Sequence, residues 1–405
     1  MKWPEVSLLA ICNPKQWPTI SSRELTDSGY LVYGADGQIG FFTAYNHEHP
    51  TILITCHGAT CGTLNICPPK TYVTGNAMAL DEPRQDIVNF KFLYFALTAR
   101  GLRDTITGAA QPQITRTNLE KVRVPLPALT EQRRIVELLE QADGLRRLRM
   151  GADTLADRIL PALFQKMFGG PNRHYKPAPF SSLVREFRYG TSNRSEGQGK
   201  PALRIPNVVG EDLDVSDLKL VPVTDDEFLR LQLLACDMLF VRTNGNPDYV
   251  GRCAVFENVA VRESGFPAND FVFASYLIRA RLKLTHANPH FIKQYLQSPA
   301  GKAALRERSR TSAGQFNINT EGLGSLPIPL PSLREQERFA TFVLSMRTLR
   351  MQRQSAREEI DQIFTTMLHR AFTSELTAKW RETHLKELLA EMEHQARLLK
   401  SLLAE

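Results

Sequence analysis

The chain has 405 residues, 42% of them hydrophobic and 23% charged, which is typical of a soluble protein with two or three domains. Its net charge of +7 favours a polyanionic partner. No apolar run reaches the ~20 residues that span a membrane, the N-terminus lacks the apolar core of a signal peptide, and six cysteines at this length do not make a disulfide framework. We therefore expect a cytoplasmic protein.

Residues 1–117 have the pattern of short strands separated by glycine-containing turns. Tyr30–Phe41 predicts a strand, a turn and a second strand, and Thr51–Thr55 predicts a short buried strand. Gly58–Leu64 predicts another turn that leads into a strand. Asn89–Leu102 is rich in aromatic residues and predicts a helix with one buried face. This part of the chain is therefore expected to be a mixed α/β domain.

A long helical pattern follows at residues 118–172. Its start is the sequence Val-Pro-Leu-Pro, whose prolines hold the chain extended, and Thr130 is a candidate N-cap. Apolar residues then recur at spacings of three and four, as in the seam of a coiled coil, with Arg149 in the middle. A continuous helix from Glu131 to Phe168 would be about 57 Å long at ~1.5 Å per residue. Pro161 is a candidate kink near its end.

Residues 173–321 repeat the pattern of the first domain with a longer beginning. Met238–Arg242 predicts a strand, Thr243–Asp248 a turn, and Tyr249–Phe256 a second strand. A helix is expected to begin at His290 and to run into Arg306–Arg310. The expected fold class of the whole chain is therefore mixed α/β.

The chain contains an internal repeat with an offset of 204 positions (329 − 125), which holds without a gap from Asn118–Gly169 to Gly322–Thr373. The second copy starts with a capping box formed by Ser332 and Glu335, and its seam carries Arg353. Two such helices most simply pair with each other, and the alternative is that each is buried in its own half. The tail, residues 374–405, predicts an amphipathic helix that docks on the chain's own first half or on a partner.

Three features resemble the specificity (S) subunit of type I restriction–modification enzymes. They are the doubled Pro-Leu-Pro-x-Leu-x-Glu-Gln motif, the glycine-rich stretch Gly29–Gly40, and the tail sequence Glu375–Glu382. The resemblance implies two α/β target recognition domains, residues 1–117 and 173–321, joined by central helices at 118–172 and 322–373. These helices are expected to form an antiparallel coiled coil, related by a pseudo-twofold repeat.

The resemblance also implies the function and the partners. Each recognition domain would read one half of a bipartite double-stranded DNA target in the major groove. Two methyltransferase (M) subunits would grip the chain, and restriction (R) subunits would join them. The chain itself would have no catalytic site, metal or cofactor, since S-adenosylmethionine, ATP and Mg belong to the partner subunits. A stiff pair of helices would set the number of unread base pairs between the half-sites.

Candidate DNA-binding residues are polar or basic side chains near the predicted turns and the repeated Gln-x-(Gln/Asn)-Ile element. Asn and Gln suit adenine, while Lys and Arg suit phosphates. For the first domain the candidates are Tyr33, Gln38, His57, Thr60, Arg103, Gln111 and Gln113. For the second they are Arg242, Asn244, Asn246, Tyr249, Arg252, Lys302, Arg306, Arg308, Arg310, Gln315 and Asn317. Because Gln111 and Gln315 recur in both halves, a scaffold role for them is an equal alternative.

Other functions have weaker support. Asn246-Pro247-Asp248-Tyr249 resembles the Asn-Pro-Pro-Tyr motif of adenine N6-methyltransferases, but its third position differs and no glycine-rich cofactor loop is found. A turn is the favoured interpretation, and a stand-alone methyltransferase is the alternative function. Cys56, His57, Cys61 and Cys67 lack the spacing of a zinc site. The chain has no phosphate-binding P-loop, and a purely structural coiled-coil scaffold is the third possibility.

Overall fold

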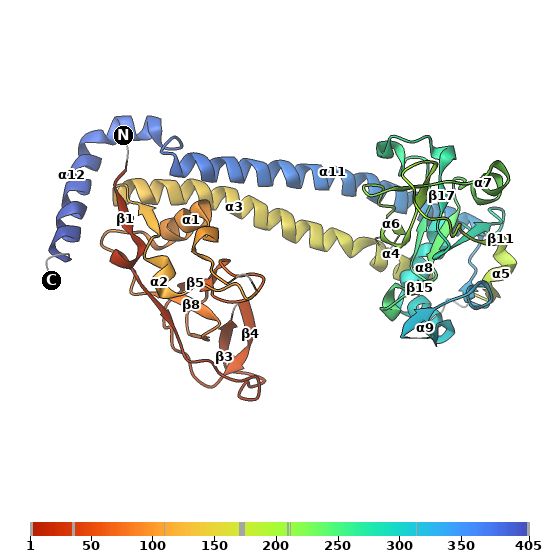
Figure 1. Ribbon diagram of the computed structural model, residues 1–405, viewed down its shortest axis with the longest axis horizontal. Helices are drawn as coiled ribbons and strands as arrows, with labels where there is room; N and C mark the ends of the chain where they lie inside the picture. Colours follow the sequence, from red (N-terminus) through yellow and green to blue (C-terminus); the bar gives the residue numbers. More distant parts are fainter. Residues whose placement is uncertain are drawn as a thin grey trace. The chain divides into compact units, whose positions relative to one another are not determined.

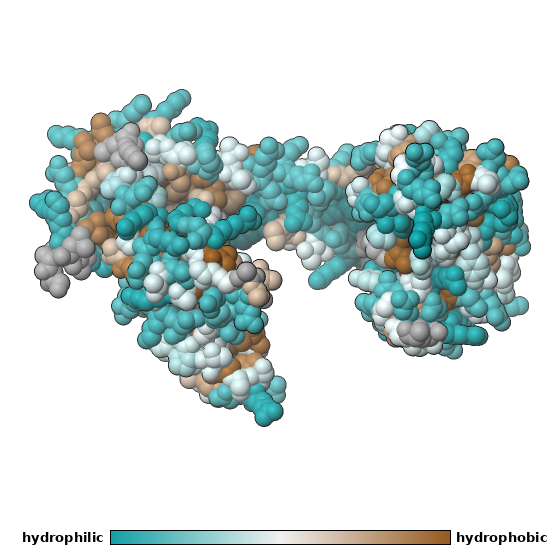
Figure 2. Space-filling view, in the orientation of Figure 1, coloured by the Kyte–Doolittle hydropathy of each residue, from teal (hydrophilic) through white to brown (hydrophobic). Residues whose placement is uncertain are grey.

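The computed structural model describes residues 3–34, 37–108, 110–169, 175–208, 210, 212–312 and 314–402 (Figure 1). It divides into two compact units. The first comprises Met1–Met150 and Ser355–Glu405, and the second comprises Gly151–Gln354. The predicted turn residues Ala35 and Asp36 lie outside the described residues. The visible surface of both units is mainly hydrophilic, with apolar residues scattered over it (Figure 2).

The first unit contains two main sheets. One has the strand order β2 (Asn13–Gln16), β8 (Ala77–Asp81), β5 (Thr51–Thr55) and β6 (Leu64–Cys67). The other has the order β4 (Gly37–Phe42), β3 (Tyr30–Gly34) and β7 (Thr71–Val73). The strand β1 (Glu5–Ser7) pairs with β9 (Arg123–Pro125), and the short helices are η1 (Leu8–Ala10), η2 (Arg103–Thr105) and α2 (Arg116–Leu119). The predicted strand pair and the buried strand at Thr51–Thr55 are confirmed.

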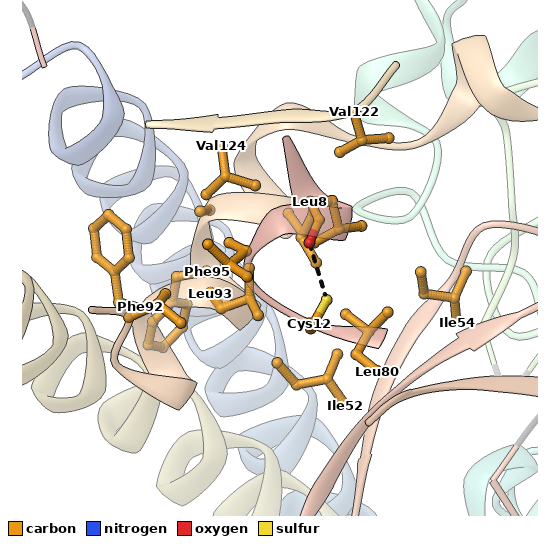
Figure 3. Packing of buried hydrophobic residues seen from close by; sticks show 14 of the residues in the cluster. Leu8, Cys12, Ile52, Ile54, Leu80, Phe92, Leu93, Phe95, Val122 and Val124 are labelled. Atoms are coloured by element: carbon orange, nitrogen blue, oxygen red, sulfur yellow. Dashed lines mark hydrogen bonds between the residues drawn. The ribbon is translucent and has the colours of Figure 1, made fainter. Parts of the chain in front are cut away.

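Helix α1 (Phe90–Arg100) covers the main sheet of the first unit and confirms the predicted aromatic helix. Its N-cap is Asn89, whose side chain accepts hydrogen bonds from two backbone amides of the first turn. Phe92 and Leu93 are fully buried against sheet residues such as Ile52, as Figure 3 shows. Burial of each such side chain contributes roughly 1.5–3 kcal/mol. This core fixes the sheet on which the candidate loops stand.

The second unit has a corresponding sheet with the strand order β11 (Val184–Tyr189), β18 (Leu277–Leu282), β14 (Met238–Val241) and β16 (Cys253–Val255). A three-stranded sheet has the order β13 (Lys219–Val221), β12 (Lys200–Leu203) and β17 (Val272–Phe273). A second three-stranded sheet has the order β15 (Thr243–Asn244), β20 (Gln315–Asn317) and β19 (Arg310–Ser312). The strand β10 (Pro177–Pro179) pairs with β21 (Pro327–Pro329). Its shorter helices include α5 (Phe180–Leu183), α6 (Ile205–Val208), α7 (Asp225–Leu231), α10 (Thr320–Gly324), η3 (Pro247–Tyr249), η4 (Arg262–Ser264) and η5 (Ala268–Asp270).

Two predicted elements of the second unit are shorter than expected. The helix predicted from His290 to Arg310 is two helices, α8 (Pro289–Gln297) and α9 (Pro299–Arg308), followed by β19. Ser298 caps α9 and Pro299 fills its first position, so the chain ends one helix and starts another there. The strand predicted over Tyr249–Phe256 is limited to Cys253–Val255, because Tyr249 ends η3 and the positive φ of Gly251 (77°) redirects the chain.

The first central helix is interrupted, which corrects the expectation of one continuous helix. Helix α3 (Leu129–Asp157) ends before Arg158, and α4 (Ile159–Phe168) begins after it. The ring of Pro161 would clash with the carbonyl of the residue four positions earlier, Asp157, which accounts for the position of the break. The expectation that Thr130 caps the helix was wrong, since Thr130 lies inside α3.

The second central helix, α11, runs from Leu333 to Phe372 and pairs with the first. Within the first unit, Arg146 Nε of α3 lies 2.7 Å from Asp361 Oδ1 of α11. Within the second unit, Arg350 Nη2 of α11 lies 3.4 Å from Asp157 Oδ1 of α3. The partner numbers on α11 fall as those on α3 rise, so the helices are antiparallel. Pairing is therefore confirmed over burial of each helix in its own half.

The tail forms helix α12 (Ala378–Leu402), and it docks on the first unit. Glu391 accepts hydrogen bonds from the backbone N and the Oγ1 of Thr130, at 3.0 and 2.5 Å. Gln395 Nε2 donates to the carbonyl of Ile87 at 2.9 Å, and Leu388 is buried. The sequence left open whether the tail docks on the chain's own first half or on a partner. In the structure it docks on the chain's own first half. None of the helices in the described residues is long and apolar enough to cross a membrane.

Candidate nucleic-acid interface

Each unit has a polar edge at the end of its main sheet, and both edges are built by the same backbone contacts. In the first unit the second residue after β5 bridges to the repeated element, His57 opposite Gln113. In the second unit the pair in β15 and β20 is Thr243 opposite Asn317. Gln113 and Asn317 occupy the same position of the internal repeat. The repeated Gln-x-(Gln/Asn)-Ile element therefore lies beside a loop from the main sheet in both units.

The repeat element is fixed to the sheet by one further hydrogen bond in each unit. Ile114 N donates to the carbonyl of Cys56 at 3.0 Å, and Ile318 N donates to the carbonyl of Arg242 at 2.9 Å. Both isoleucines are buried, with exposed fractions of 1% and 2%. The polar residues beside them consequently stand on a buried anchor, which keeps the exposed side chains in place.

Matching glycines close the loop in both units. Gly62 (φ 88°) donates to the carbonyl of Thr55, and Gly251 (φ 77°) donates to the carbonyl of Val241, both at 2.9 Å. Left-handed backbone of this kind favours glycine, and a Cβ at Gly251 would lie 2.5 Å from the side chain of Leu305. The loop enclosed is residues 57–61 in the first unit and the longer 243–250 in the second. The edges thus share a frame and differ in the loop it holds.

The first unit brings most of its predicted residues to this edge. His57 and Thr60 are exposed in the loop, and Gln111 and Gln113 are exposed in the repeat element. Arg103 is exposed in η2, which leads into the strand residue that pairs with Gln113, Thr107.

Tyr33 and Gln38 lie on the other sheet of the first unit, where they pair with each other across β3 and β4. Tyr33 is packed against the buried residues Leu53 and Val73. Its ring therefore supports the fold. Gln38 is exposed.

In the second unit the loop holds its shape with its own asparagines. Asn244 Oδ1 accepts from the backbone N of Asn246, and Asn246 Oδ1 accepts from that of Asp248, both at 2.9 Å. Asn246 thereby caps η3, with Pro247 at the first position. The Asn-Pro-Asp-Tyr sequence is therefore a helix-capping turn, as favoured above, and its asparagine oxygen is engaged in the fold.

Arginines next to this loop lie over aromatic rings. The guanidinium of Arg252 lies 4.2 Å from the ring centroid of Tyr249, and Arg252 Nε donates to the carbonyl of Asp248 at 2.9 Å. The guanidinium of Arg242 lies 4.9 Å from the ring of Tyr189. Stacking leaves the edges of a guanidinium directed sideways, where they can meet a base or a phosphate.

Helix α9 adds further positive charge beside the loop. Arg306 forms an ion pair with Asp248 at 2.5 Å, and the Arg306 guanidinium lowers the pKa of that carboxyl group. Both side chains are more than half exposed, so the pair is weak and Arg306 can exchange Asp248 for a phosphate at small cost. Lys302 on the same helix and Arg310 on β19 are exposed.

Two predicted residues have structural contacts instead. Arg308 Nε donates to the carbonyl of Ser325 at 3.3 Å, and its Nη1 donates to that of Ala304 at 3.1 Å, so it fastens the end of α9. Gln315 Oε1 accepts from Thr243 Oγ1 at 3.0 Å, which matches the scaffold alternative for this position. The contacts of Arg308 with Ser325 and of Gln315 with Thr243 join residues 17 and 72 positions apart, which local sequence patterns do not reveal.

The predictions from the sequence did not include two buried glutamines, Gln132 and Gln336, which contact the N-caps of α1 and α8. Gln132 Nε2 donates to the carbonyls of Ile87 (2.9 Å) and Pro127 (2.8 Å), while its Oε1 accepts from the backbone N of Asn89, the N-cap of α1 (2.8 Å). Gln132 is fully buried. Gln132 therefore ties the start of α1 to the start of α3.

The second unit repeats this arrangement. Gln336 Nε2 donates to the carbonyls of His286 (3.3 Å) and Pro331 (2.9 Å), and its Oε1 accepts from the backbone N of Asn288, the N-cap of α8 (2.9 Å). The signal was present in the sequence, since Glu-Gln recurs at the same place at the start of both central helices.

Two of the cysteines near the first loop are buried in the core. Cys56 and Cys67 are fully buried, and burial raises the pKa of the Cys56 thiol to about 12. A protonated thiol is a poor ligand and a poor nucleophile. Within the part of the chain that the structure describes, there is no group of three or more His, Cys, Asp or Glu residues that could hold a metal ion.

Comparisons with known proteins agree with the architecture. Residues 1–149 match the family described as type I restriction modification DNA specificity domain. The chain is 28% identical over 408 residues to the type I restriction enzyme EcoKI specificity subunit of Escherichia coli (strain K12), covering 95% of this chain and 82% of the relative. It is 23% identical over 368 residues to the StySPI specificity subunit of Salmonella potsdam, covering 86% and 74%.

Solved structures share the fold. The type I restriction–modification system S subunit from M. genitalium has a TM-score of 0.59 at 14% identity, over 92% of this chain and 96% of that one. A structure that describes complex assembly and conformational transition of the type I R-M system has a TM-score of 0.54 at 16% identity, over 93% and 98%. Residues 1–149 are thus similar to the type I restriction modification DNA specificity domain family, and most of the chain is similar to specificity subunits of type I restriction enzymes.

Proposed function

We propose that this chain is the non-catalytic DNA-reading subunit of a type I restriction–modification complex, and that each unit reads one half of a bipartite target. The observation that carries the proposal is the polar edge built twice on the same frame with different residues. His57 and Gln113 in the first unit stand where Thr243 and Asn317 stand in the second. A repeated frame with unlike side chains fits two readers of unlike half-sites.

The chemistry of the edges fits DNA. Asn and Gln amides can bond adenine through two hydrogen bonds in the major groove, and arginine can bond guanine in the same way. Lys302, Arg306 and Arg310 are exposed on the side of the loop where phosphates would lie. Phosphate contacts fix the register of the protein on the duplex, while the loop residues read the bases.

The paired central helices are proposed as the ruler between half-sites. Insertion of one helical turn into both α3 and α11 should change the spacer of the methylated sequence and leave both half-sites unchanged. Methylated-base mapping in cells that express the variant with its methyltransferase partner measures this directly. An unchanged spacer would count against the ruler.

The chemistry is proposed to reside in partners. Two M subunits would bind S-adenosylmethionine and transfer the methyl group, and R subunits would use ATP and Mg to act on unmodified DNA, in the cytoplasm where the chromosome lies. The purified chain, given S-adenosylmethionine and DNA, should transfer no methyl groups until an M subunit is added. Transfer by the chain alone would favour the alternative, a stand-alone adenine N6-methyltransferase.

Half-site assignment provides the sharpest test. Gln113→Ala should relax the sequence of one half-site only, and Asn317→Ala should relax the other only, by roughly 1–3 kcal/mol of discrimination at one position. Lys302→Ala should weaken binding to all sequences and reduce the salt dependence of affinity. If both Ala variants change the same half-site, the proposed division of labour is wrong.

A further inference from the structure

The second unit contains a set of charged side chains and one histidine between its recognition part and helix α11, which we name the charged bracket. Arg347 and Arg350 come from α11, Glu257 follows β16, Asp212 lies after α6, and His290 comes from α8. β16 begins two residues after Gly251, the glycine that closes the candidate DNA-reading loop. The bracket therefore connects the strand next to that loop to the central helix.

Arg347 is the centre of the charged bracket. Its Nη1 forms an ion pair with Glu257, and its Nε lies 3.9 Å from Asp212. His290 Nε2 approaches the other Glu257 oxygen at 3.3 Å, and Arg350 Nη1 lies 3.9 Å from Asp212. The exposed fractions of the Arg347 and Glu257 side chains are 22% and 18%, so salt screens this pair less than an exposed one.

The first unit is built differently at the same place. The residue that matches Arg347 in the repeat is Asp143, which contacts Arg146 and Arg147 of its own helix. There α1 is joined to α3 by the ion pair of Lys91 with Glu140, and it meets α11 through aromatic rings, as in the pair Phe95–Phe364, with centroids 6.4 Å apart. The charged bracket thus belongs to the second unit.

Cohesion of the second unit does not depend on the bracket. Phe291 of α8 packs on Phe168 of α4 with ring centroids 4.9 Å apart, and Phe339 of α11 is fully buried in the same core. Apolar burial is non-directional, and the hydrogen bonds of Gln336 fasten only the start of α8 to α11, so the angle of the recognition part on α11 depends on further contacts. A guanidinium paired with a carboxylate is directional, and several such contacts at the edge of a core fix an angle.

We propose that Arg347 is a positioning residue that fixes the orientation of the second recognition part on α11, and that it thereby confines DNA recognition to a single spacer length. This inference rests on the proposed function. Without Arg347, the recognition part rotates on its aromatic core, and the reading loop meets bases one pair nearer or farther. Each half-site would still be read correctly, because the loops themselves are unchanged.

The test compares methylation of three duplexes by the chain assembled with its M subunit. The duplexes carry both half-sites separated by the natural spacer, or by one base pair fewer or more. The preference for the natural spacer, measured as a ratio of kcat/KM values, should fall about tenfold in Arg347→Met, within the usual range of coupling between contacting residues. Half-site sequence preference should stay the same, a separation that loss of stability would not produce.

Two further variants accompany it. Arg338→Met makes the same change at an exposed position of the same helix and should keep the wild-type spacer preference. Glu257→Gln removes the opposite charge with almost no change in shape and should reduce the spacer preference as Arg347→Met does. Thermal melting of each assembled complex establishes that the variants are folded.

The outcomes separate the two proposals. If the wild-type complex shows no bipartite target, the proposed function fails irrespective of Arg347. If the wild type has a fixed spacer and a folded Arg347→Met or Glu257→Gln complex keeps the full preference, the positioning role is wrong. If both variants are unfolded at the assay temperature, the bracket is a stability element, and the positioning role is equally overturned.

Discussion

Glu131 and Glu335 occupy the same position of the internal repeat, yet the two units use them differently. Glu335 is half-buried and forms the capping box, with its carboxylate accepting from Ser332 Oγ at 2.7 Å. Glu131 is 1% exposed and forms an ion pair with Arg381 of α12 at 2.7 Å. Trp3 Nε1 and Thr377 Oγ1 also donate to Glu131, at 3.2 and 2.6 Å.

The difference follows from one missing hydroxyl and one added helix. Ala128 stands where the second copy has Ser332, so α3 lacks the side chain that caps α11. Glu391 of the tail instead accepts from the backbone N of Thr130 in the first turn of α3. A carboxylate near a helix N-terminus is favourable from either source. The same motif is therefore a local cap in one unit and a tertiary anchor in the other.

Glu131→Ala tests this difference with the largest expected effect. It leaves Arg381 buried without its carboxylate, and the first unit should lose about 3–5 kcal/mol of unfolding free energy. Glu335→Ala removes only a cap from the second unit and should cost about 1 kcal/mol. Denaturant titrations of both variants measure the two losses.

The three tryptophans, Trp3, Trp17 and Trp380, are all in the first unit. Their fluorescence therefore follows unfolding of the first unit, while the helical circular dichroism signal includes both. Equal losses in the two variants would show that the tail contact adds nothing to the cap.

The comparison of α8 with its counterpart α1 gives the next test. His290 of α8 is half-buried, and desolvation together with the nearby charge of Lys293 lowers its pKa from 6.5 to about 4, against the opposing effect of Asp212. Between these values the unfolded chain binds the proton that the folded second unit excludes. The unfolding free energy should therefore fall as pH falls from about 6.5 to 4, by roughly 2–3 kcal/mol.

The change His290→Gln should flatten this pH dependence, because the glutamine does not titrate. The matching residue of α1 is Lys91, which is exposed and pairs with Glu140. The first unit therefore has no histidine at the position that His290 occupies in the second. Denaturation followed by circular dichroism at pH 7 and pH 5 measures the slope. A wild-type slope that survives in His290→Gln would assign it to other groups.

The same comparison shows what the sequence could predict. The strands around Thr51–Thr55 and Met238–Val241, the paired helices and the Ser332 capping box depend on local patterns, and these were predicted. The break before Ile159 and the division at Ser298 required closer weighting of Pro161 and Pro299, since proline ends helices.

Other features depend on contacts between distant segments. The environment of Glu131 requires the tail to fold back over 250 positions to place Arg381, and no pattern near Glu131 announces this. In the candidate site, the sequence did not separate side chains that support the fold, such as Arg308, from those left exposed, such as Arg306. That separation depends on which carbonyls happen to lie near each guanidinium.

The buried glutamines provide a finer comparison. Gln336→Ala removes the acceptor of Asn288 N and the donor of two carbonyls, which should cost about 2 kcal/mol. Gln132→Ala should cost about 1 kcal/mol less, because Gln395 also donates to the carbonyl of Ile87 and remains in place. Chemical denaturation of both variants and of Gln132→Ala combined with Gln395→Ala checks this. If the double variant costs no more than Gln132→Ala, Gln395 provides no substitute.

The smallest expected effect concerns the N-terminal partner of each glutamate. Trp3 donates to Glu131 at 3.2 Å in a buried site, and Tyr175 OH donates to Glu335 at 3.4 Å in a partly buried one. Trp3→Phe should cost about 1–2 kcal/mol, because a buried charge loses a donor, whereas Tyr175→Phe should cost at most about 0.5 kcal/mol, since water can replace a long hydrogen bond. Trp17 and Trp380 still report unfolding of the first unit in Trp3→Phe, and circular dichroism reports Tyr175→Phe. A larger loss for Tyr175→Phe would mean that Glu335 anchors the second unit as Glu131 anchors the first, and that the two copies differ less than their contacts indicate.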